Sequence, residues 1–168
     1  MSRYLIMSDI HGRLDTLQKI LDKESEGKLD GILIAGDIEV DPAKISEMIY
    51  MSFKNPPCPK IYMVRGNCDS GRYGLQDVLA TDAGEGHRIF LTHGHRYSVK
   101  ADNVMLAAVA SNNGADIAVY GHTHEPCDEN VAGVRCINPG AVCGGYFSHS
   151  SYAILTIDAG IMVEHFVL

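Results

Sequence analysis

Short apolar runs alternate with amphipathic segments along the chain as far as Pro126. The runs are rich in β-branched and aromatic residues and end close to glycine, which is typical of buried strands. They cover residues 3–8, 32–35, 61–64, 89–91 and 117–120. Residues 14–21 and 42–49 instead place apolar side chains on one helical stripe, and residues 102–112 suit a short helix. This strand–helix–strand order predicts parallel strands joined by right-handed crossovers.

The pattern changes after Pro126, where strands follow one another without helices between them. Residues 131–137, 151–157 and 161–167 read as strands, and residues 158–160 read as a hairpin turn. Strands joined without helices favour antiparallel pairing. A parallel half and an antiparallel half together predict an α/β fold of two mixed sheets packed face to face. The helices would lie outside, in a single domain spanning residues 1–168.

Composition restricts the partners that such a domain can have. The formal net charge of −7 disfavours long nucleic acid and favours small substrates. Five cysteines without a C-x-x-C pair argue against a disulfide framework and suit a reducing cytoplasm. No signal peptide is visible, and no apolar run approaches the roughly 18 residues that span a bilayer. We therefore expect a soluble, cytoplasmic protein with no membrane partner.

Residues that commonly bind metals follow directly after five of the predicted strands. They are Asp9 and His11, Asp37, Asn67, His93, and His122 with His124. Ligands of α/β sheets bind beyond the carboxyl ends of the strands, so these side chains are expected to share one site. Residues two apart in extended chain point to the same side, and adjacent glycines let the backbone approach a ligand closely. Oxygen and imidazole donors favour a hard or borderline divalent ion.

Seven such ligands are too many for one ion that must also leave room for a substrate. They suit two divalent ions, with Asp37 bridging them through its two carboxylate oxygens. Ions about 3.5–4 Å apart can hold a bridging hydroxide and clamp a phosphoryl oxygen during in-line attack. The pattern therefore predicts hydrolysis of phosphate esters without a side-chain nucleophile.

The order of these motifs resembles that of the calcineurin-like metallophosphoesterases. Along the chains of that family, the motifs D-x-H, G-D, G-N-x-D/E, H and G-H-x-H follow one another in this order. The corresponding residues here are Asp9/His11, Gly36-Asp37, Gly66-Asn67-Cys68-Asp69, His93 and Gly121-His122-Thr123-His124. The short chain, residues 91–100 and Asn138-Pro139-Gly140 look most like the YfcE-type phosphodiesterases of bacteria and archaea.

The resemblance implies a fold, a cofactor and an activity. The fold would be a four-layer α/β/β/α sandwich of two mixed β-sheets flanked by helices. One ion would be bound by Asp9, His11, Asp37 and His124, and the other by Asp37, Asn67, His93 and His122. Manganese is the usual cofactor of this family, with nickel, cobalt, iron or zinc as alternatives. The activity would be divalent-metal-dependent hydrolysis of small phosphodiesters.

Four residues around the ligands are candidates for roles in the reaction. Asn67 is expected to stabilise charge on the phosphoryl oxygens. Asp69 would orient a neighbour such as His93, although a plain loop carboxylate fits equally well. Cys68 and His95 are candidates for contact with the substrate. Many family members have histidine in place of Cys68, and a neutral thiol is a poor proton donor, which favours diesters with good leaving groups.

Other interpretations are compatible with parts of the sequence. Asp9 alone would suit a helix cap, and Asp37 alone would suit a turn. The family motif G-D-x-x-D/N is incomplete at Val40, so a hydrogen bond to a ligand is either missing or supplied by Glu39. A retromer subunit of this fold is a protein-binding scaffold with a degraded metal site, whereas every ligand position here holds a competent donor.

A nucleotide pyrophosphatase or nuclease is a third interpretation, because it would use the same metal pair. Specificity is expected to come from loops around residues 70–80, where Gly71 and Gly74 bracket a loop. Exposed apolar edges would support a homo-oligomer.

Overall fold

The computed structural model describes residues 1–145 and 149–168. Its elements are, in chain order, β1 (Ser2–Met7), α1 (Leu14–Glu24), β2 (Gly31–Ile34), α2 (Pro42–Ser52), β3 (Lys60–Met63), the 3₁₀ helix η1 (Gly71–Tyr73), β4 (Val78–Gly84), β5 (His87–Thr92), α3 (Val104–Asn112), β6 (Ile117–Val119), β7 (Pro126–Val131), β8 (Val134–Pro139), β9 (Ser151–Ile157) and β10 (Ile161–Val167).

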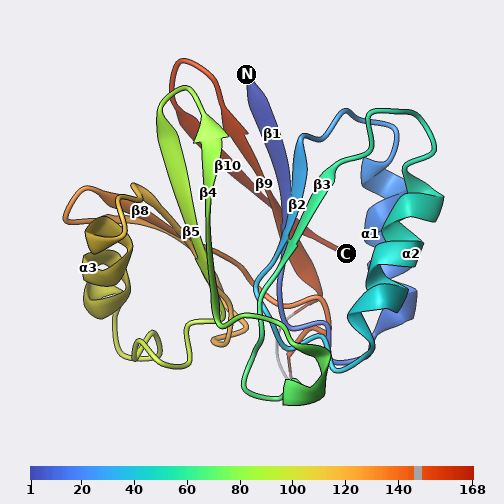
Figure 1. The fold of residues 1–168 in the computed structure, drawn as a ribbon, viewed down its shortest axis with the longest axis horizontal. Helices are drawn as coiled ribbons and strands as arrows, with labels where there is room; N and C mark the ends of the chain where they lie inside the picture. Colours follow the sequence, from blue (N-terminus) through green and yellow to red (C-terminus); the bar gives the residue numbers. More distant parts are fainter. Residues whose placement is uncertain (146–148) are drawn as a thin grey trace.

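The strands form two five-stranded mixed sheets that face each other (Figure 1). The first sheet has the strand order β10-β9-β1-β2-β3, and the second has the order β4-β5-β6-β8-β7. Helices α1 and α2 cover the outer face of the first sheet, and α3 covers the outer face of the second. The predicted α/β fold and its four layers are therefore confirmed.

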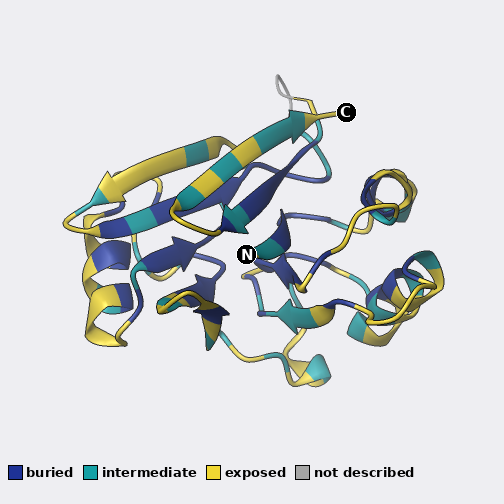
Figure 2. Ribbon diagram, turned by 90° about the horizontal axis from the view of Figure 1, so that it is seen from above, coloured by how far each residue is buried: buried dark blue, intermediate teal, exposed yellow. Residues whose placement is uncertain are grey.

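Alternation of side chains along the strands separates three apolar clusters. In β1, Leu5 and Met7 point towards α1 and α2, whereas Tyr4 and Ile6 point towards the second sheet. Successive strand residues point to opposite faces of a sheet, so both faces of β1 are buried. Figure 2 shows this burial from above: the central strands of the two sheets are mostly buried, and the outward faces of the helices are exposed.

The start of α2 follows the chemistry that the sequence predicts. Asp41 lies in extended conformation, and its carboxylate accepts a hydrogen bond from Ala43 N at 2.9 Å. Pro42 occupies the first helical turn, where its missing N–H would have no partner in the helix. Ile45 and Ile49 then bury the inner face of the helix against the first sheet.

The structure corrects the predicted single strand over residues 131–137. Ala132 and Gly133 both have positive φ, at 51° and 88°, and form the turn of a hairpin between β7 and β8. Such turns match the twist of the flanking strands, but they usually begin with asparagine, aspartate or glycine rather than alanine. The expected antiparallel pairing after Pro126 holds for β8 against β7, but on its other side β8 pairs with β6 in parallel.

Two other predicted boundaries differ from the structure. The region assigned to a specificity loop contains η1 and the beginning of β4, an antiparallel edge strand beside β5. The helix expected over residues 102–112 begins at Val104, because the Asp102 carboxylate accepts a hydrogen bond from Val104 N at 3.0 Å. Among the described residues, no helix is both long and apolar enough to cross a bilayer.

Candidate metal centre

The carboxyl ends of five strands from both sheets meet at one edge of the sandwich. The side chains predicted as ligands lie just beyond these ends: Asp9 and His11 after β1, Asp37 after β2, Asn67 after β3, His93 after β5, and His122 with His124 after β6. Asp9, Asp37 and His93 are buried, and ligand atoms of these three lie within 4.8 Å of one another. The fold therefore brings the predicted residues to one place.

Asp9 forms one side of the cluster, together with two imidazoles. Its Oδ1 atom lies 3.1 Å from His124 Nε2 and 3.7 Å from His11 Nε2. Neither nitrogen makes a hydrogen bond of good geometry to buried Oδ1 among the residues that the structure describes, so without metal its charge is balanced by the nearby His124 imidazolium. A bound cation would take the place of that positive charge.

Asp37 lies between the two halves of the cluster. Its Oδ2 atom is 3.8 Å from His11 Nε2 on one side and 3.1 Å from His93 Nε2 on the other. The other oxygen, Oδ1, accepts a hydrogen bond from Cys68 N at 2.8 Å. This central carboxylate is therefore positioned to interact with positive charge in both halves.

His93, Asn67 and His122 form the other side. His93 Nε2 lies 3.1 Å from Asn67 Oδ1, and the His93 and His122 ring centroids are 5.1 Å apart. His93 Nδ1 lies 2.6 Å from the Ala35 carbonyl oxygen, which can only accept, so Nδ1 carries a proton. Without metal Nε2 also carries a proton, because Asp37 and Asp9 raise the pKa of His93, and this nitrogen then faces oxygen atoms of Asp37 and Asn67. A bound cation would take the place of that proton.

The outer nitrogen of His11 is held in a similar way. His11 Nδ1 lies 2.6 Å from Glu39 Oε2, which confirms that Glu39 supplies the hydrogen bond left open by Val40. The paired carboxylate fixes the orientation of the ring and directs Nε2 towards Asp9 and Asp37. Such contacts to the second ring nitrogen are usual for metal-binding histidines.

Backbone strain is concentrated at this cluster. Nine non-glycine residues in the described part of the chain have positive φ, and six of them belong to the cluster or contact it. They are Asp9, His11, Asp37, Glu39, His122 and His124. Non-glycine residues in this region cost about 1–3 kcal/mol each and persist where the surrounding structure requires them. This concentration is typical of a functional site.

Gly66 permits close approach of two strand-end loops. A Cβ atom built on Gly66 would overlap both the carboxylate and the backbone nitrogen of Asp37. Any larger residue would therefore displace the central carboxylate of the cluster. The glycine is required here by packing, independently of its backbone conformation.

Charge in the cluster favours a cation. Burial raises the pKa of Asp37, but His93 and the Cys68 backbone outweigh it and lower the pKa to about 2. Burial lowers the pKa of His93, but Asp37 and Asp9 more than compensate and raise it. The Asp9 carboxylate, with a contribution from Cys143, raises the pKa of His124 to about 10. Without metal, the carboxylates therefore retain protons on their imidazole neighbours.

Two further imidazoles stay neutral. Burial lowers the pKa of His122, and the positive charges of His93 and Lys100 lower it further. Burial, His93 and Arg96 lower the pKa of His95 in the same way. The His95 ring centroid is 5.5 Å from that of His93, so the predicted substrate contact lies beside the cluster.

The structure does not support the suggested contact between Asp69 and His93. Asp69 instead accepts hydrogen bonds from Gly66 N and Glu39 N, both at 2.8 Å, and joins two strand-end loops. Cys68, the predicted substrate contact, is exposed beside Asn67, whose amide nitrogen lies 3.2 Å from its sulfur. Asp69 thus has a structural role in positioning the loops.

Two neighbours of the cluster were not predicted as part of it. Cys143 lies beside His11 and His124, with ligand atoms of all three within 4.8 Å of one another. It has no ligand at short sequence spacing, so only the fold reveals it. Lys100 contributes to lowering the pKa of His122.

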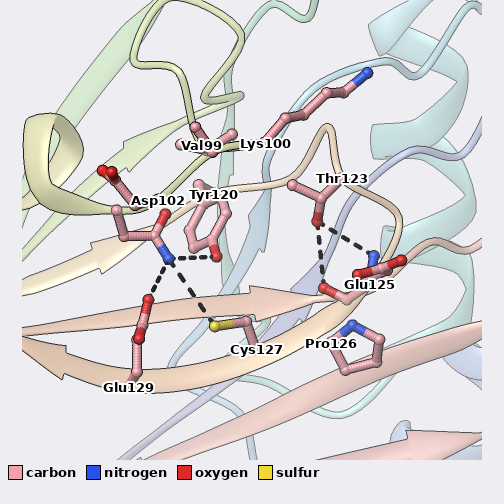
Figure 3. A pocket seen from close by; sticks show the side chains of 11 residues that line it. Val99, Lys100, Asp102, Tyr120, Thr123, Glu125, Pro126, Cys127 and Glu129 are labelled. Carbon is pink, nitrogen blue, oxygen red and sulfur yellow. Dashed lines mark hydrogen bonds between the residues drawn. The ribbon is translucent and has the colours of Figure 1, made fainter.

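A polar pocket of about 470 Å³ lies between the loop that precedes α3 and the loop that follows β6 (Figure 3). Thr123, between His122 and His124, lines it together with Lys100 and Tyr120. Asn103 donates hydrogen bonds to Tyr120 Oη at 2.8 Å and Glu129 Oε1 at 2.7 Å, which fixes the pocket wall. The pocket therefore shares a loop with the candidate metal centre.

Comparison with known proteins identifies the class to which this fold and site belong. The model of the calcineurin-like phosphoesterase superfamily domain matches residues 3–160. The chain therefore belongs to the calcineurin-like phosphoesterase superfamily, a class of phosphoric ester hydrolases.

Individual relatives agree with this assignment. The chain is 33% identical over 155 residues to a probable metallophosphoesterase, YsnB, of Bacillus subtilis, covering 92% of this chain and 83% of that protein. It is 31% identical to phosphodiesterase YfcE of Escherichia coli, covering 94% and 89% respectively. The structure of Vps29 from Entamoeba histolytica in complex with Zn²⁺ superposes with a TM-score of 0.74 at 21% identity, covering 98% of both chains. This last similarity shows the fold alone.

Proposed function

We propose that this protein is a divalent-metal-dependent phosphodiesterase that hydrolyses small phosphate diesters at the strand-end cluster. The central observation is the position of the Asp37 carboxylate between His11 and His93, 3.8 and 3.1 Å from their Nε2 atoms. Its pKa of about 2 keeps it anionic under all ordinary conditions. A carboxylate so placed suits a bridge between two cations.

The donor set fits two ions on either side of Asp37. Asp9 Oδ1, beside His124, and His93 Nε2, which faces oxygen atoms, are atoms that a cation would bind in place of the imidazole protons. Mn²⁺ suits the oxygen and imidazole donors. The first ion would be held by Asp9, His11, Asp37 and His124, and the second by Asp37, Asn67, His93 and His122. When bound, such ions would offset the charge of the phosphoryl group and lower the pKa of water, so that hydroxide is available to attack phosphorus near neutral pH.

The remaining side chains would bind and orient the phosphoryl group. Asn67 has its amide at the edge of the cluster and would stabilise charge on a phosphoryl oxygen. His95 is neutral because its pKa is lowered, and it would offer a hydrogen bond beside His93. Lys100 would add long-range attraction for the anionic substrate, since its charge already reaches His122.

Cys68 limits the range of leaving groups. Burial and the neighbouring Asp37 raise the pKa of its thiol to about 11, so the thiol keeps its proton at neutral pH. Efficient general acids have a pKa near the working pH. This supports diesters with good leaving groups over monoesters. The pocket lined by Lys100, Tyr120 and Thr123 would accommodate one ester group, since its volume of about 470 Å³ lies within the usual range for small ligands.

Hydrolysis of two aryl esters tests this proposal. Purified protein would be stripped with a chelator, reloaded with Mn²⁺, Ni²⁺ or Mg²⁺, and assayed with bis(p-nitrophenyl) phosphate and p-nitrophenyl phosphate. We expect metal-dependent turnover that is faster for the diester. Asp37→Asn and His93→Ala should abolish it, whereas the matched surface control Asp158→Asn should retain it, because Asp158 is 68% exposed.

Two results would overturn the assignment. Full activity of Asp37→Asn would exclude the cluster as the active site. Absence of turnover by metal-loaded protein across phosphomonoesters, diesters and nucleotides would favour a protein-binding scaffold of the same fold instead.

A further inference from the structure

Cys143 lies where a metal ligand would lie, although it is outside the family motifs quoted above. Its sulfur and one nitrogen each of His11 and His124 lie within 4.8 Å of one another. Two ligands bound to one ion at about 2.1 and 2.3 Å are at most about 4.4 Å apart. Small side-chain adjustments would therefore bring all three atoms onto a single ion.

The backbone holds Cys143 in register with the first metal ligands. Val142 N donates to Ser8 O at 2.9 Å, and Cys143 N donates to Asp9 O at 3.0 Å. Val142 itself is completely buried. These hydrogen bonds fix the main chain of Cys143 beside Asp9, so its sulfur can change position only by rotation of the side chain.

The surroundings of Cys143 differ from those of an ordinary core cysteine. Cys136 is fully buried among apolar side chains of the cluster beneath α3. Cys143 is half-buried, its thiol lies 3.0 Å from the Gly144 carbonyl oxygen, and two imidazoles lie beside it. A thiol among polar donors next to a cation site is placed to act as a ligand rather than as packing.

We propose that Cys143 binds the first metal ion as a thiolate, together with Asp9, His11, His124 and the bridging Asp37. On binding, the sulfur–metal bond forms, the thiol proton passes to solvent, and the hydrogen bond to Gly144 is lost. The proposal rests on the metal centre of the proposed phosphodiesterase and refines it.

A thiolate changes which metal the first position selects. Soft sulfur favours Zn²⁺, Co²⁺ or Fe²⁺ over Mn²⁺, whereas a position with oxygen and imidazole donors alone suits Mn²⁺. The two positions would therefore differ in selectivity, with a softer ion held beside Cys143. The second position retains the harder set Asp37, Asn67, His93 and His122.

Cobalt absorption spectra test whether sulfur is a ligand. Metal-free protein would be titrated with two equivalents of Co²⁺, which gives visible d–d bands when bound and a near-ultraviolet charge-transfer band when bound to thiolate. We expect both in the native chain and loss of the charge-transfer band in Cys143→Ser. Cys68→Ser is the critical comparison, since Cys68 also lies within 4.8 Å of His11 and Asp37. The exposed Cys58 provides a control, and Cys58→Ser should leave the spectrum unchanged.

The outcomes separate this inference from the function on which it rests. Visible bands without a charge-transfer band, or a band lost in Cys68→Ser and kept in Cys143→Ser, would overturn the ligand assignment and leave the metal centre intact. Absence of bound Co²⁺ would instead refute the metal centre itself.

Metal content and thiol protection provide independent readouts. In dialysis against equal concentrations of Zn²⁺ and Mn²⁺, Cys143→Ser should lower the Zn:Mn ratio bound per chain at least about tenfold. Loss of a hydrogen bond to a metal ligand already lowers metal affinity by about this factor, and loss of a ligand should have a larger effect. If the variant fails to fold, alkylation of the native chain can be followed by mass spectrometry. Zn²⁺ should protect Cys143 from iodoacetamide, and unchanged alkylation would contradict the proposal.

Discussion

Replacing Asp37 with asparagine would remove a charge while preserving the shape of the side chain. In the metal-free protein, its carboxylate lies 3.1 Å from His93 Nε2 and accepts a hydrogen bond from Cys68 N at 2.8 Å. These interactions overcome burial and lower the pKa of Asp37 from 3.8 to about 2. At about 1.4 kcal/mol per pH unit, the difference corresponds to about 2 kcal/mol of folding free energy. The side chain is only 3% exposed, so solvent screening is slight.

The sign of the effect follows from the direction of the pKa change. A carboxylate with a depressed folded-state pKa stabilises the fold above pH 3.8, and this contribution is lost as the pH falls through about 2. The raised pKa of His93 arises from the same ion pair with Asp37, so it adds no further free energy to this value. We expect Asp37→Asn to lower the free energy of unfolding by about 2 kcal/mol at pH 7, or about 4–8 °C in melting temperature.

Urea denaturation in EDTA, followed by circular dichroism at several pH values, would measure this difference. The gap between native chain and Asp37→Asn should narrow steadily below pH 4. Asp158→Asn, at an exposed position, should match the native chain throughout. Equal stability of Asp37→Asn and native chain at pH 7, or a gap that does not change with pH, would refute the role of the ion pair.

Three further predictions address the site and the core. Gly66→Ala should abolish metal-dependent turnover, because its Cβ would overlap the Asp37 carboxylate, whereas Gly160→Ala, with no atom within 4 Å, should retain it. Leu155→Ala, buried between the two sheets, should lower the free energy of unfolding by about 2–5 kcal/mol in urea, and a loss below about 1 kcal/mol would contradict close packing there. Burial and Asp37 raise the pKa of Cys68 to about 11, so its rate of alkylation by iodoacetamide in metal-free protein should keep rising to about pH 11; a plateau near pH 9 would be inconsistent with this.

Local sequence was sufficient to predict the strands that build the site. Residues 32–35 and 117–120 are apolar on both faces because each lies between two buried layers. The hairpin of β7 and β8 was missed because Ala132 adopts a positive φ that its residue type does not indicate. The edge strand β4 was missed because its sequence includes Asp82 and two alanines, which have low strand propensity.

The ligand cluster was predictable because each ligand directly follows a strand. Contacts made across the fold were not. Cys143 reaches the cluster through a backbone hydrogen bond to Asp9, which is distant in the chain. Of the two roles expected for Asp69, orienting a neighbour such as His93 or acting as a loop carboxylate, the fold supports the second, because Asp69 binds the backbone of Gly66 and Glu39. Such contacts depend on how loops from different strands meet, which residue type and spacing do not specify.

Anomalous diffraction from crystals soaked in Mn²⁺ would show directly whether two ions bind around Asp37. We expect two peaks about 3.5–4 Å apart, one on the side of Asp9 and His124 and the other on the side of His93. Peaks elsewhere on the protein, or an Asp37 carboxylate that touches no metal, would contradict the proposed centre.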